Sequence, residues 1–185
     1  FVAETMAEIR AAGIYNIGGG DRDTQMFLHG CTISGNGFAY EGGGIYNSSQ
    51  MELTDCTISG NGAYDGGGIY NAEEWIPNRS VSSISEDSYE EEASYVSEMK
   101  LTNCSISDNT SERGGGIFNR SMIEIIDSDI SNNSGEDYGG GIYNATGGYG
   151  GREAQAYLSG CTISGNSSYY QGGGIYNADQ GWIPS

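Results

Sequence analysis

The chain has 185 residues and a formal net charge of −18 at pH 7, because 25 acidic residues face only seven lysines and arginines. Such a polyanion repels nucleic acid and anionic membrane surfaces and attracts cations. We therefore predict no nucleic-acid partner. No run of about 18 apolar residues occurs, so we also predict no membrane-spanning helix. Glycine supplies 32 residues and proline only two, unlike collagen or proline-rich disordered chains. The length suits one domain, predicted over residues 1–185.

Residues 1–10 precede the first repeated segment and are predicted to cap the fold. Val2, Met6 and Ile9 recur near helical spacing, with Glu4 and Glu8 between them. This spacing favours a short amphipathic helix, and an extra strand is the alternative. Either element would cover strand edges that are otherwise exposed at the end of a repeat fold.

Two short phrases alternate along the rest of the chain. Gly-Gly-Gly-Ile-Tyr-Asn stands at 42–47, 66–71, 139–144 and 172–177, with Phe118 in place of tyrosine at 114–119 and a degenerate copy at 11–16. The second phrase, Leu-His-Gly-Cys-Thr-Ile-Ser-Gly-Asn at 28–36, returns in related form at 53–61, 101–109, 125–133 and 158–166. Recurrence at a fixed period indicates a repeat architecture.

The repeated unit predicts short strands joined by tight corners. Leu53, Cys56 and Ile58 are separated by polar residues, and this period of two marks strands with one buried face. Gly-Asn and Gly-Gly pairs supply the positive φ that corners need. The shortest units run 24 and 25 residues. We therefore predict an all-β fold, a single-stranded parallel β-helix of about five coils, with insertions at one corner.

Stacked coils place equivalent residues about 4.8 Å apart, so each repeated position predicts a ladder along the axis. The expected inward ladders are Ile14/Ile45/Ile69/Ile117/Ile142/Ile175, Ile33/Ile58/Ile106/Ile130/Ile163 and Leu28/Leu53/Leu101/Ile125/Leu158. Amide side chains should bond from coil to coil in Asn36/Asn61/Asn109/Asn133/Asn166 and Asn16/Asn47/Asn71/Asn119/Asn144/Asn177. By alternation, we predict that Tyr15, Tyr46, Tyr70, Phe118, Tyr143 and Tyr176 form an aromatic stripe on the surface.

Insertions are expected after Asn16, Asn71 and Asn144, where the next strand phrase begins 12, 30 and 14 residues later instead of six. They leave one edge of the solenoid only, and such decoration often marks the binding face of a repeat protein. The longest insertion, predicted over 72–98, is Ser-rich and carries eight acidic residues. It is either a solvated flexible loop or a hairpin that contacts a partner.

Apolar residues of this insertion recur near the C-terminus. Trp75-Ile76-Pro77 returns as Trp182-Ile183-Pro184, within a predicted C-terminal cap or assembly segment at 178–185. The residues predicted to contact a partner or a second copy are Trp75, Ile76, Pro77, Trp182, Ile183, Pro184, Tyr46, Tyr70, Tyr143 and Tyr176. The sequence opens and closes with half a coil, so head-to-tail stacking into a filament is one hypothesis and an excerpt from a longer solenoid is the other.

Acidic residues make calcium the small partner to expect. Asp21 and Asp23 follow a glycine run, and Glu136 and Asp137 lie together in a later repeat. Because hard cations take carboxylate and carbonyl oxygens, these four residues are candidate calcium ligands, with diffuse counterions as the alternative. No other cofactor is predicted. Asn78, within the longest insertion, is the Asn-x-Ser/Thr acceptor predicted to be accessible to glycosylation.

Residues that could carry catalysis do not converge in the sequence. Cys31, Cys56, Cys104 and Cys161 share one ladder position, lack the spacing of a thiolate metal site and are predicted to be buried thiols, with disulfides as the alternative in a secreted protein. His29 lies outward on a strand without a triad arrangement nearby in the sequence. Asp127 and Asp129, with Asp55 predicted one coil below Asp127, are the candidate carboxylates of a glycosidase. An enzyme that acts on an acidic polysaccharide needs basic residues gathered at its site, and the seven lysines and arginines of this chain are scattered. We therefore predict that the protein is not an enzyme.

The pairing of Gly-Gly-Gly-Ile with Ile-Ser-x-Asn resembles the short motifs of chlamydial-type polymorphic outer-membrane proteins and, more broadly, right-handed parallel β-helix repeat proteins of bacterial surfaces, autotransporter passenger domains included. The resemblance covers residues 11–177, and the third glycine stands where the family often has alanine. It implies a right-handed helix and an extracellular or cell-surface location. We expect a non-enzymatic structural or adhesive solenoid, in a filament or surface fibre, that contacts itself or a cell-surface or glycan ligand. The alternative is a carbohydrate-active, polysaccharide-binding or lyase-like β-helix.

Overall fold

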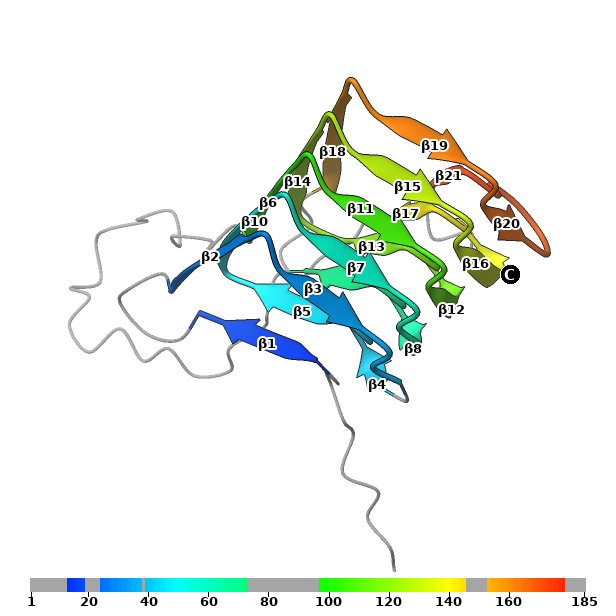
Figure 1. Cartoon of the computed structure of the whole chain (residues 1–185). Helices are drawn as coiled ribbons and strands as arrows, with labels where there is room; N and C mark the ends of the chain where they lie inside the picture. The colour runs from blue at the N-terminus through cyan, green and yellow to red at the C-terminus, as the bar shows by residue number, and fades with distance from the viewer. Residues whose placement is uncertain (1–12, 19–23, 38, 73–96, 146–152, 179–185) are drawn as a thin grey trace, which may run out of the picture.

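The chain forms a right-handed parallel β-helix in a computed structural model that describes residues 13–18, 24–37, 39–72, 97–145 and 153–178 (Figure 1). All secondary structure in these ranges is strand, and every strand pairing is parallel. The predicted all-β solenoid is therefore confirmed. The predicted cap at 1–10 lies outside the described residues, as does 179–185 within the predicted C-terminal segment.

Four sheets run along the axis, and each coil contributes one strand to each sheet. Sheet A contains β1 (Ile14–Ile17), β5 (Ile45–Ser48), β9 (Ile69–Asn71), β13 (Ile117–Asn119), β17 (Ile142–Ala145) and β21 (Ile175–Ala178). Sheet B contains β2 (Gln25–His29), β6 (Gln50–Thr54), β10 (Glu98–Thr102), β14 (Met122–Ile126) and β18 (Gln155–Ser159). Sheet C contains β3 (Thr32–Ser34), β7 (Thr57–Ser59), β11 (Ser105–Ser107), β15 (Asp129–Ser131) and β19 (Thr162–Ser164). Sheet D contains β4 (Ala39–Glu41), β8 (Ala63–Asp65), β12 (Thr110–Arg113), β16 (Ser134–Tyr138) and β20 (Ser167–Ser168).

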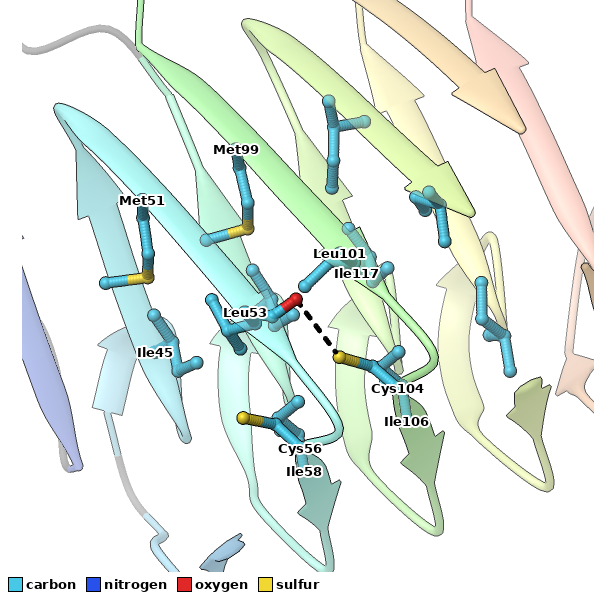
Figure 2. Packing of buried hydrophobic residues seen from close by; sticks show 14 of the residues in the cluster. Ile45, Met51, Leu53, Cys56, Ile58, Met99, Leu101, Cys104, Ile106 and Ile117 are labelled. Carbon is cyan, nitrogen blue, oxygen red and sulfur yellow. Dashed lines mark hydrogen bonds between the residues drawn. The ribbon is translucent and has the colours of Figure 1, made fainter. Parts of the chain in front are cut away.

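The hydrophobic core consists of ladders that run through the inside of the coils (Figure 2). The three predicted apolar ladders are in register, as in Ile45↔Ile69 and Ile58↔Ile106. A further inward ladder in sheet B, Met26/Met51/Met99/Ile123/Ala156, was not predicted. Its residue type changes from methionine in three successive coils to Ile123 and Ala156 in the next two, and it lies outside the two repeated phrases.

Both predicted asparagine ladders are present. In sheet A the Nδ2 of each asparagine donates to the Oδ1 of the next, at 2.7–2.9 Å, from Asn16 through to Asn177. At the corner after sheet C, the backbone N–H and the Nδ2 of each asparagine both donate to the Oδ1 of the next, at 2.9–3.0 Å, from Asn36 to Asn166. Because these amides are largely buried, the ladders satisfy polar groups that would otherwise destabilise the corners.

The Gly-Gly-Gly corner between sheets D and A depends on two properties of glycine. Gly66 has a φ of +65°, which side chains rarely tolerate. A Cβ added at Gly67 would lie 2.6 Å from the carbonyl oxygen of Gly115 and still closer to that of Thr110. The backbones of successive coils therefore pass too close for any side chain.

The insertions all leave the corner between sheets A and B, as predicted. The longest one is predicted over 72–98, and the residues at both ends of that range keep coil-to-coil hydrogen bonds. The backbone N–H of Ala72 donates to Asn47 O, and that of Glu98, already in β10, donates to Ser49 O. Residues 73–96, between these flanks, lie outside the described residues.

Candidate functional site

An aromatic row follows the outer face of sheet A, opposite the isoleucines of the core. Successive rings of Tyr15, Tyr46, Tyr70, Phe118, Tyr143 and Tyr176 are stacked, with centroids 4.7–5.4 Å apart. Offset stacking at these distances adds to the stabilisation from burial. The alternation that places these rings opposite the core is confirmed.

The predicted exposure of this row is wrong. Tyr46, Tyr70, Phe118 and Tyr143 are each at most 4% exposed and belong to a second buried cluster; Tyr15, in the first coil, is 43% exposed. The reason is the Gly-Gly-Gly corner, which lets side chains of sheet D pack against this face of sheet A. Tyr138 of β16, for example, stacks on Tyr176 with centroids 4.9 Å apart. The middle of the row therefore packs the fold and is not an exposed contact surface.

An ionic pair packs against the same row. The residues that directly precede each Gly-Gly-Gly segment, Glu41, Asp65, Arg113, Tyr138 and Gln171, are neighbours along sheet D. Arg113 Nε donates to Asp65 Oδ1 at 2.8 Å, and Nη2 donates to Oδ2 at 2.7 Å. The side chain of Asp65 is 7% exposed and that of Arg113 is 28% exposed. This is the bidentate geometry in which arginine holds a carboxylate most firmly.

Burial sets the ionisation of this cluster. It raises the pKa of the Asp65 carboxyl above its ordinary value of 3.8, although the Arg113 guanidinium acts in the opposite direction. Burial also raises the pKa of the Tyr70 hydroxyl, with a contribution from Glu41, so this phenol stays neutral. The positive charge of Arg120, which follows β13, lowers both pKa values.

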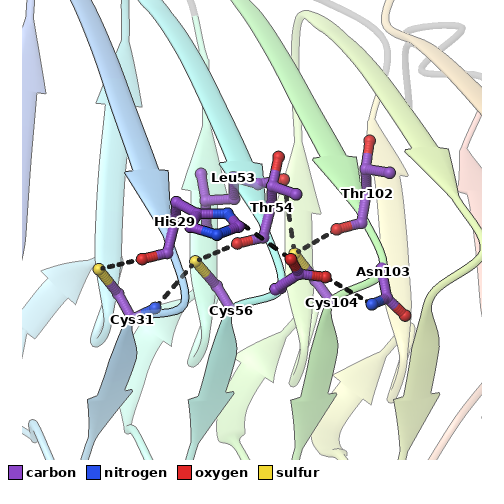
Figure 3. Close-up of polar contacts among 9 residues, drawn as sticks. His29, Cys31, Leu53, Thr54, Cys56, Thr102, Asn103 and Cys104 are labelled. Carbon is purple, nitrogen blue, oxygen red and sulfur yellow. Dashed lines mark hydrogen bonds and ion pairs between the residues drawn. The ribbon is translucent and has the colours of Figure 1, made fainter.

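A second polar column occupies the corner between sheets B and C (Figure 3). His29 Nδ1 lies 3.6 Å from Asp55 Oδ2, and Asn103 Nδ2 donates to Asp55 Oδ1.

The prediction that Asp55 lies one coil below Asp127 is wrong, because the coil of Asn103 lies between them. Asp129 accepts a hydrogen bond from Ser131 at 2.7 Å on sheet C. The predicted glycosidase carboxylates Asp127 and Asp55 are thus two coils apart along this corner.

The cysteines occupy one inward position at the start of sheet C. Cys31, Cys56, Cys104 and Cys161 are all free thiols; Cys56 and Cys104 are buried, which agrees with the predicted thiol ladder. The Cys104 thiol donates to Thr102 O and Leu53 O, at 3.3 and 3.6 Å, and the Cys31 N–H donates to Cys56 Sγ at 3.4 Å. Burial raises the pKa of Cys104, which makes its thiolate less accessible.

The remaining predicted sites are only partly within the described residues. Asp21, Asp23, Asn78, Trp75, Ile76, Pro77, Trp182, Ile183 and Pro184 lie outside them. Glu136 and Asp137 lie on β16, and within the described ranges no three His, Cys, Asp or Glu side chains cluster as metal ligands do. Calcium binding stays a prediction. Two other Asn-x-Ser sequences, at Asn103 and Asn132, are exposed at corners with positive φ, so Asn78 is not the one accessible acceptor.

The ionic pair was also overlooked, because Asp65 and Arg113 are 48 residues apart. A usable signal exists in their shared position, directly before a Gly-Gly-Gly segment. Aligning the repeats on the glycines brings all five residues of that column together. Opposite charges in successive described coils then predict a contact.

These features define a class: a right-handed parallel β-solenoid whose two asparagine ladders and outer aromatic row run the length of the described coils. Within that class, residues 55–72 and 160–178 match the Chlamydia polymorphic membrane protein repeat. Each match spans one strand of sheet C, one of sheet D, the glycine corner and one strand of sheet A. No curated protein and no solved structure matches the chain.

This similarity indicates a surface-associated β-helical protein. The described ranges contain no helix that could cross a membrane.

Proposed function

We propose that this chain is a non-enzymatic structural and adhesive portion of an extracellular or cell-surface protein. The solenoid is the scaffold, and the corner between sheets A and B presents insertions to a partner. The polymorphic membrane protein repeat supports the surface location. The main support for the proposal is that the residues flanking each insertion occupy the same positions as the residues of a corner without an insertion.

Each insertion is an excursion between two positions that remain in the solenoid. Two corners are bare: only Ser48 and Ser49 separate Asn47 from Gln50, and Arg120 and Ser121 occupy the equivalent positions two coils later. At the longest insertion, Ala72 and Ser97 occupy these two positions. The Ala72 N–H donates to Asn47 O, and the Met122 N–H donates to Ser97 O.

The other two insertions follow the same rule. The first insertion, residues 18–23, is flanked by Ile17 and Thr24, and the Gln50 N–H donates to Thr24 O. The third, residues 146–153, is flanked by Ala145 and Ala154. The strand that follows it begins at Gln155, whose N–H donates to Ser121 O. Insertions therefore occur in every second coil, about 9.6 Å apart, which leaves each one more room than a single coil spacing would give. Variable segments on an invariant scaffold are the usual arrangement of binding loops.

Deletion of the longest insertion tests this proposal. A Δ73–96 variant joins Ala72 to Ser97 and recreates the length of the two bare corners. A Δ146–153 variant joins Ala145 to Ala154 in the same way and is the matched control. Beads coated with the wild-type chain, either variant or albumin would be scored for attachment to cultured animal-cell monolayers. We expect wild-type beads to attach well above albumin, and Δ73–96 beads to lose most of that attachment.

The scaffold is assessed in parallel by circular dichroism melting. Both deletions should keep a cooperative transition within a few degrees of wild type, because the flanks already hold their hydrogen bonds. Attachment of wild-type beads at the albumin level would refute the adhesive role. Loss of cooperative melting in Δ73–96 would refute the scaffold role. Head-to-tail assembly stays a prediction, and the carbohydrate-active alternative has no comparable support.

A further inference from the structure

The four cysteines repeat at one position of the coil, but they differ in what occupies that position in the adjacent coil. Cys31 directly precedes β3 and Cys56 directly precedes β7, and these two strands pair in register. Cys161 and Ser128 stand in the same relation, because they precede β19 and β15, which also pair in register. Cys31 is therefore level with a second thiol, whereas Cys161 is level with a hydroxyl.

The thiols also differ in their exposure to solvent. Cys31 and Cys161 are partly exposed, while Cys56 is 1% and Cys104 is 3% exposed. Burial raises the pKa of the Cys104 thiol, so this residue forms the reactive thiolate less readily. A reagent in solution therefore meets Cys31 and Cys161 before it meets the two buried thiols.

The thiol of Cys56 leans onto the backbone of Cys31 (Figure 3). The Cys31 N–H donates to Cys56 Sγ at 3.4 Å, and the Thr57 N–H donates to Cys31 O at 2.8 Å. Residues that are level in adjacent coils have Cα atoms about 4.8 Å apart, within the range of about 4.4–6.8 Å that a disulfide spans. The Cys31 thiol donates to His29 O at 3.5 Å, so it has to rotate about its Cα–Cβ bond to meet Cys56 Sγ.

We propose that Cys31 and Cys56 are a thiol–disulfide exchange site for low-molecular-weight disulfides, whereas Cys161 exchanges once and keeps the adduct. The Cys31 thiolate attacks one sulfur of the small disulfide, which forms a mixed disulfide and releases one small thiolate. The Cys56 thiolate then attacks the Cys31 sulfur, forms the Cys31–Cys56 bond and releases the second small thiolate. The two cysteines lose two electrons and two protons, and the small disulfide gains them as two thiols. At Cys161 the exchange ends after the first step, because Ser128 has no thiol.

The surface association of the repeat family provides the setting, since disulfides form and persist in oxidising extracellular environments. The exchange does not depend on the proposed adhesive role and is measured without any cell. Its product fastens the coil of Cys31 to the coil of Cys56 by a covalent bond.

The test incubates the folded, reduced chain with oxidised glutathione at neutral pH. Remaining thiols are alkylated after unfolding, and each cysteine is identified by mass spectrometry of unreduced peptides. We expect most molecules to carry a Cys31–Cys56 link and a glutathione adduct on Cys161. Cys104 should be recovered as an alkylated thiol, because it is buried and its neighbour Cys56 is already bonded.

Two substitutions exchange the neighbours of the exposed thiols. Cys56→Ser should leave Cys31 with a retained glutathione adduct, as Cys161 has in the wild-type chain. Ser128→Cys should have the opposite effect, so that the adduct on Cys161 is replaced by a link to position 128. Both variants should fold, because cysteine and serine already occupy this position in different coils. Circular dichroism melting of the reduced proteins verifies this.

Several results would overturn the proposal. A glutathione adduct that persists on Cys31 in the wild-type chain would mean that the level thiol does not displace it. A link between Cys56 and Cys104, or between two chains, would place the exchange elsewhere. No reaction at Cys31, under conditions that modify the urea-unfolded chain, would show that its partial exposure gives no access. An adduct retained on Cys161 in Ser128→Cys would show that a level position in the adjacent coil is not sufficient.

Discussion

The buried carboxylate of Asp65 and the guanidinium of Arg113 come from adjacent coils, 48 residues apart, and meet through two parallel hydrogen bonds of 2.8 and 2.7 Å. Asp65 is almost fully enclosed, so its charge depends mainly on Arg113 for compensation, with a smaller contribution from Arg120. Arg113 also covers the aromatic row through Phe118. The pair therefore joins two coils and two sheets at the same point.

Arg113→Gln should destabilise the fold by about 3 kcal/mol, because it leaves a buried carboxylate unpaired. The lower end of the range for buried pairs applies since Arg113 is partly exposed. Urea unfolding followed by circular dichroism measures the change. Lys100→Gln is the matched control: its ion pair with Glu124 is nearly half exposed on both sides, so its loss should cost much less than the loss of Arg113. Equal effects of the two variants would contradict this assignment.

The Asp65 carboxyl should titrate above its ordinary value of 3.8 in a ¹³C NMR titration, because burial raises its pKa. Between 3.8 and that raised pKa, the folded chain holds more protons on this group than the unfolded chain does. The contribution of Asp65 to stability is therefore full below 3.8 and is lost as the pH rises through the folded pKa. Arg113→Gln should raise the pKa further, by removing the group that lowers it. A titration midpoint at or below 3.8 would be inconsistent with the described burial.

Asn71→Leu should cost about 2–4 kcal/mol, because Asn71 makes four hydrogen bonds within the sheet A ladder. Its Oδ1 accepts from Asn47 Nδ2 and Ser97 Oγ, and its Nδ2 donates to Asn119 Oδ1 and Met122 O. Asn177→Leu, at the last rung of the same ladder, removes the hydrogen bond that Asn144 donates and should cost less than about 1 kcal/mol. Thermal melts compare the two, and similar losses would argue against a continuous ladder.

Ile58→Asp should unfold the domain, since Ile58 is fully buried and the new carboxylate would have no partner inside the coil. Thr57→Asp, on the opposite face of β7, is the control. Asp129 occupies the same column two coils away, so an aspartate there is already accommodated. Circular dichroism should show cooperative melting for Thr57→Asp alone. A native-like melt of Ile58→Asp would disprove the inward assignment of this ladder.

Gly67→Ala should destabilise the fold by about 1–3 kcal/mol or more, because the methyl group would press on the carbonyl oxygens of Thr110 and Gly115. Gly37→Ala has nothing within 4 Å of the added Cβ and a φ outside the positive region, so it should be neutral or slightly stabilising. Melting temperatures distinguish the two substitutions. Tolerance of alanine at Gly67 would mean that the coils can separate at this corner.

The repeated residue types were sufficient to predict the coil. Ile45 and Ile69, or Asn47 and Asn71, recur at one spacing, and a parallel stack converts equal spacing into direct contact. Both asparagine ladders, the three apolar ladders and the corner that carries the insertions followed from that rule. The Met51 ladder did not, because its rungs change from methionine to Ile123 and Ala156 and lie outside the two repeated phrases.

The candidate site was less accessible to such reasoning. Alternation placed Tyr70 on the face opposite Ile69, but it could not tell whether that face meets water or other side chains. The face is covered because sheet D turns at the Gly-Gly-Gly corner, which lets Arg113 and Tyr138 pack on the aromatic row. Exposure is a property of the whole cross-section and not of one strand.

The sequence by itself thus determined the period, the inward face and the residues that contact along the axis, because these depend on equal positions in successive repeats. Only the tertiary structure decided which outward residues are covered, because covering requires two different sheets to meet across a corner. The contacts of Arg113 and Arg120 with the ring of Phe118 arise at that meeting. Contacts of this kind join unlike positions of the repeat, and no periodicity specifies them.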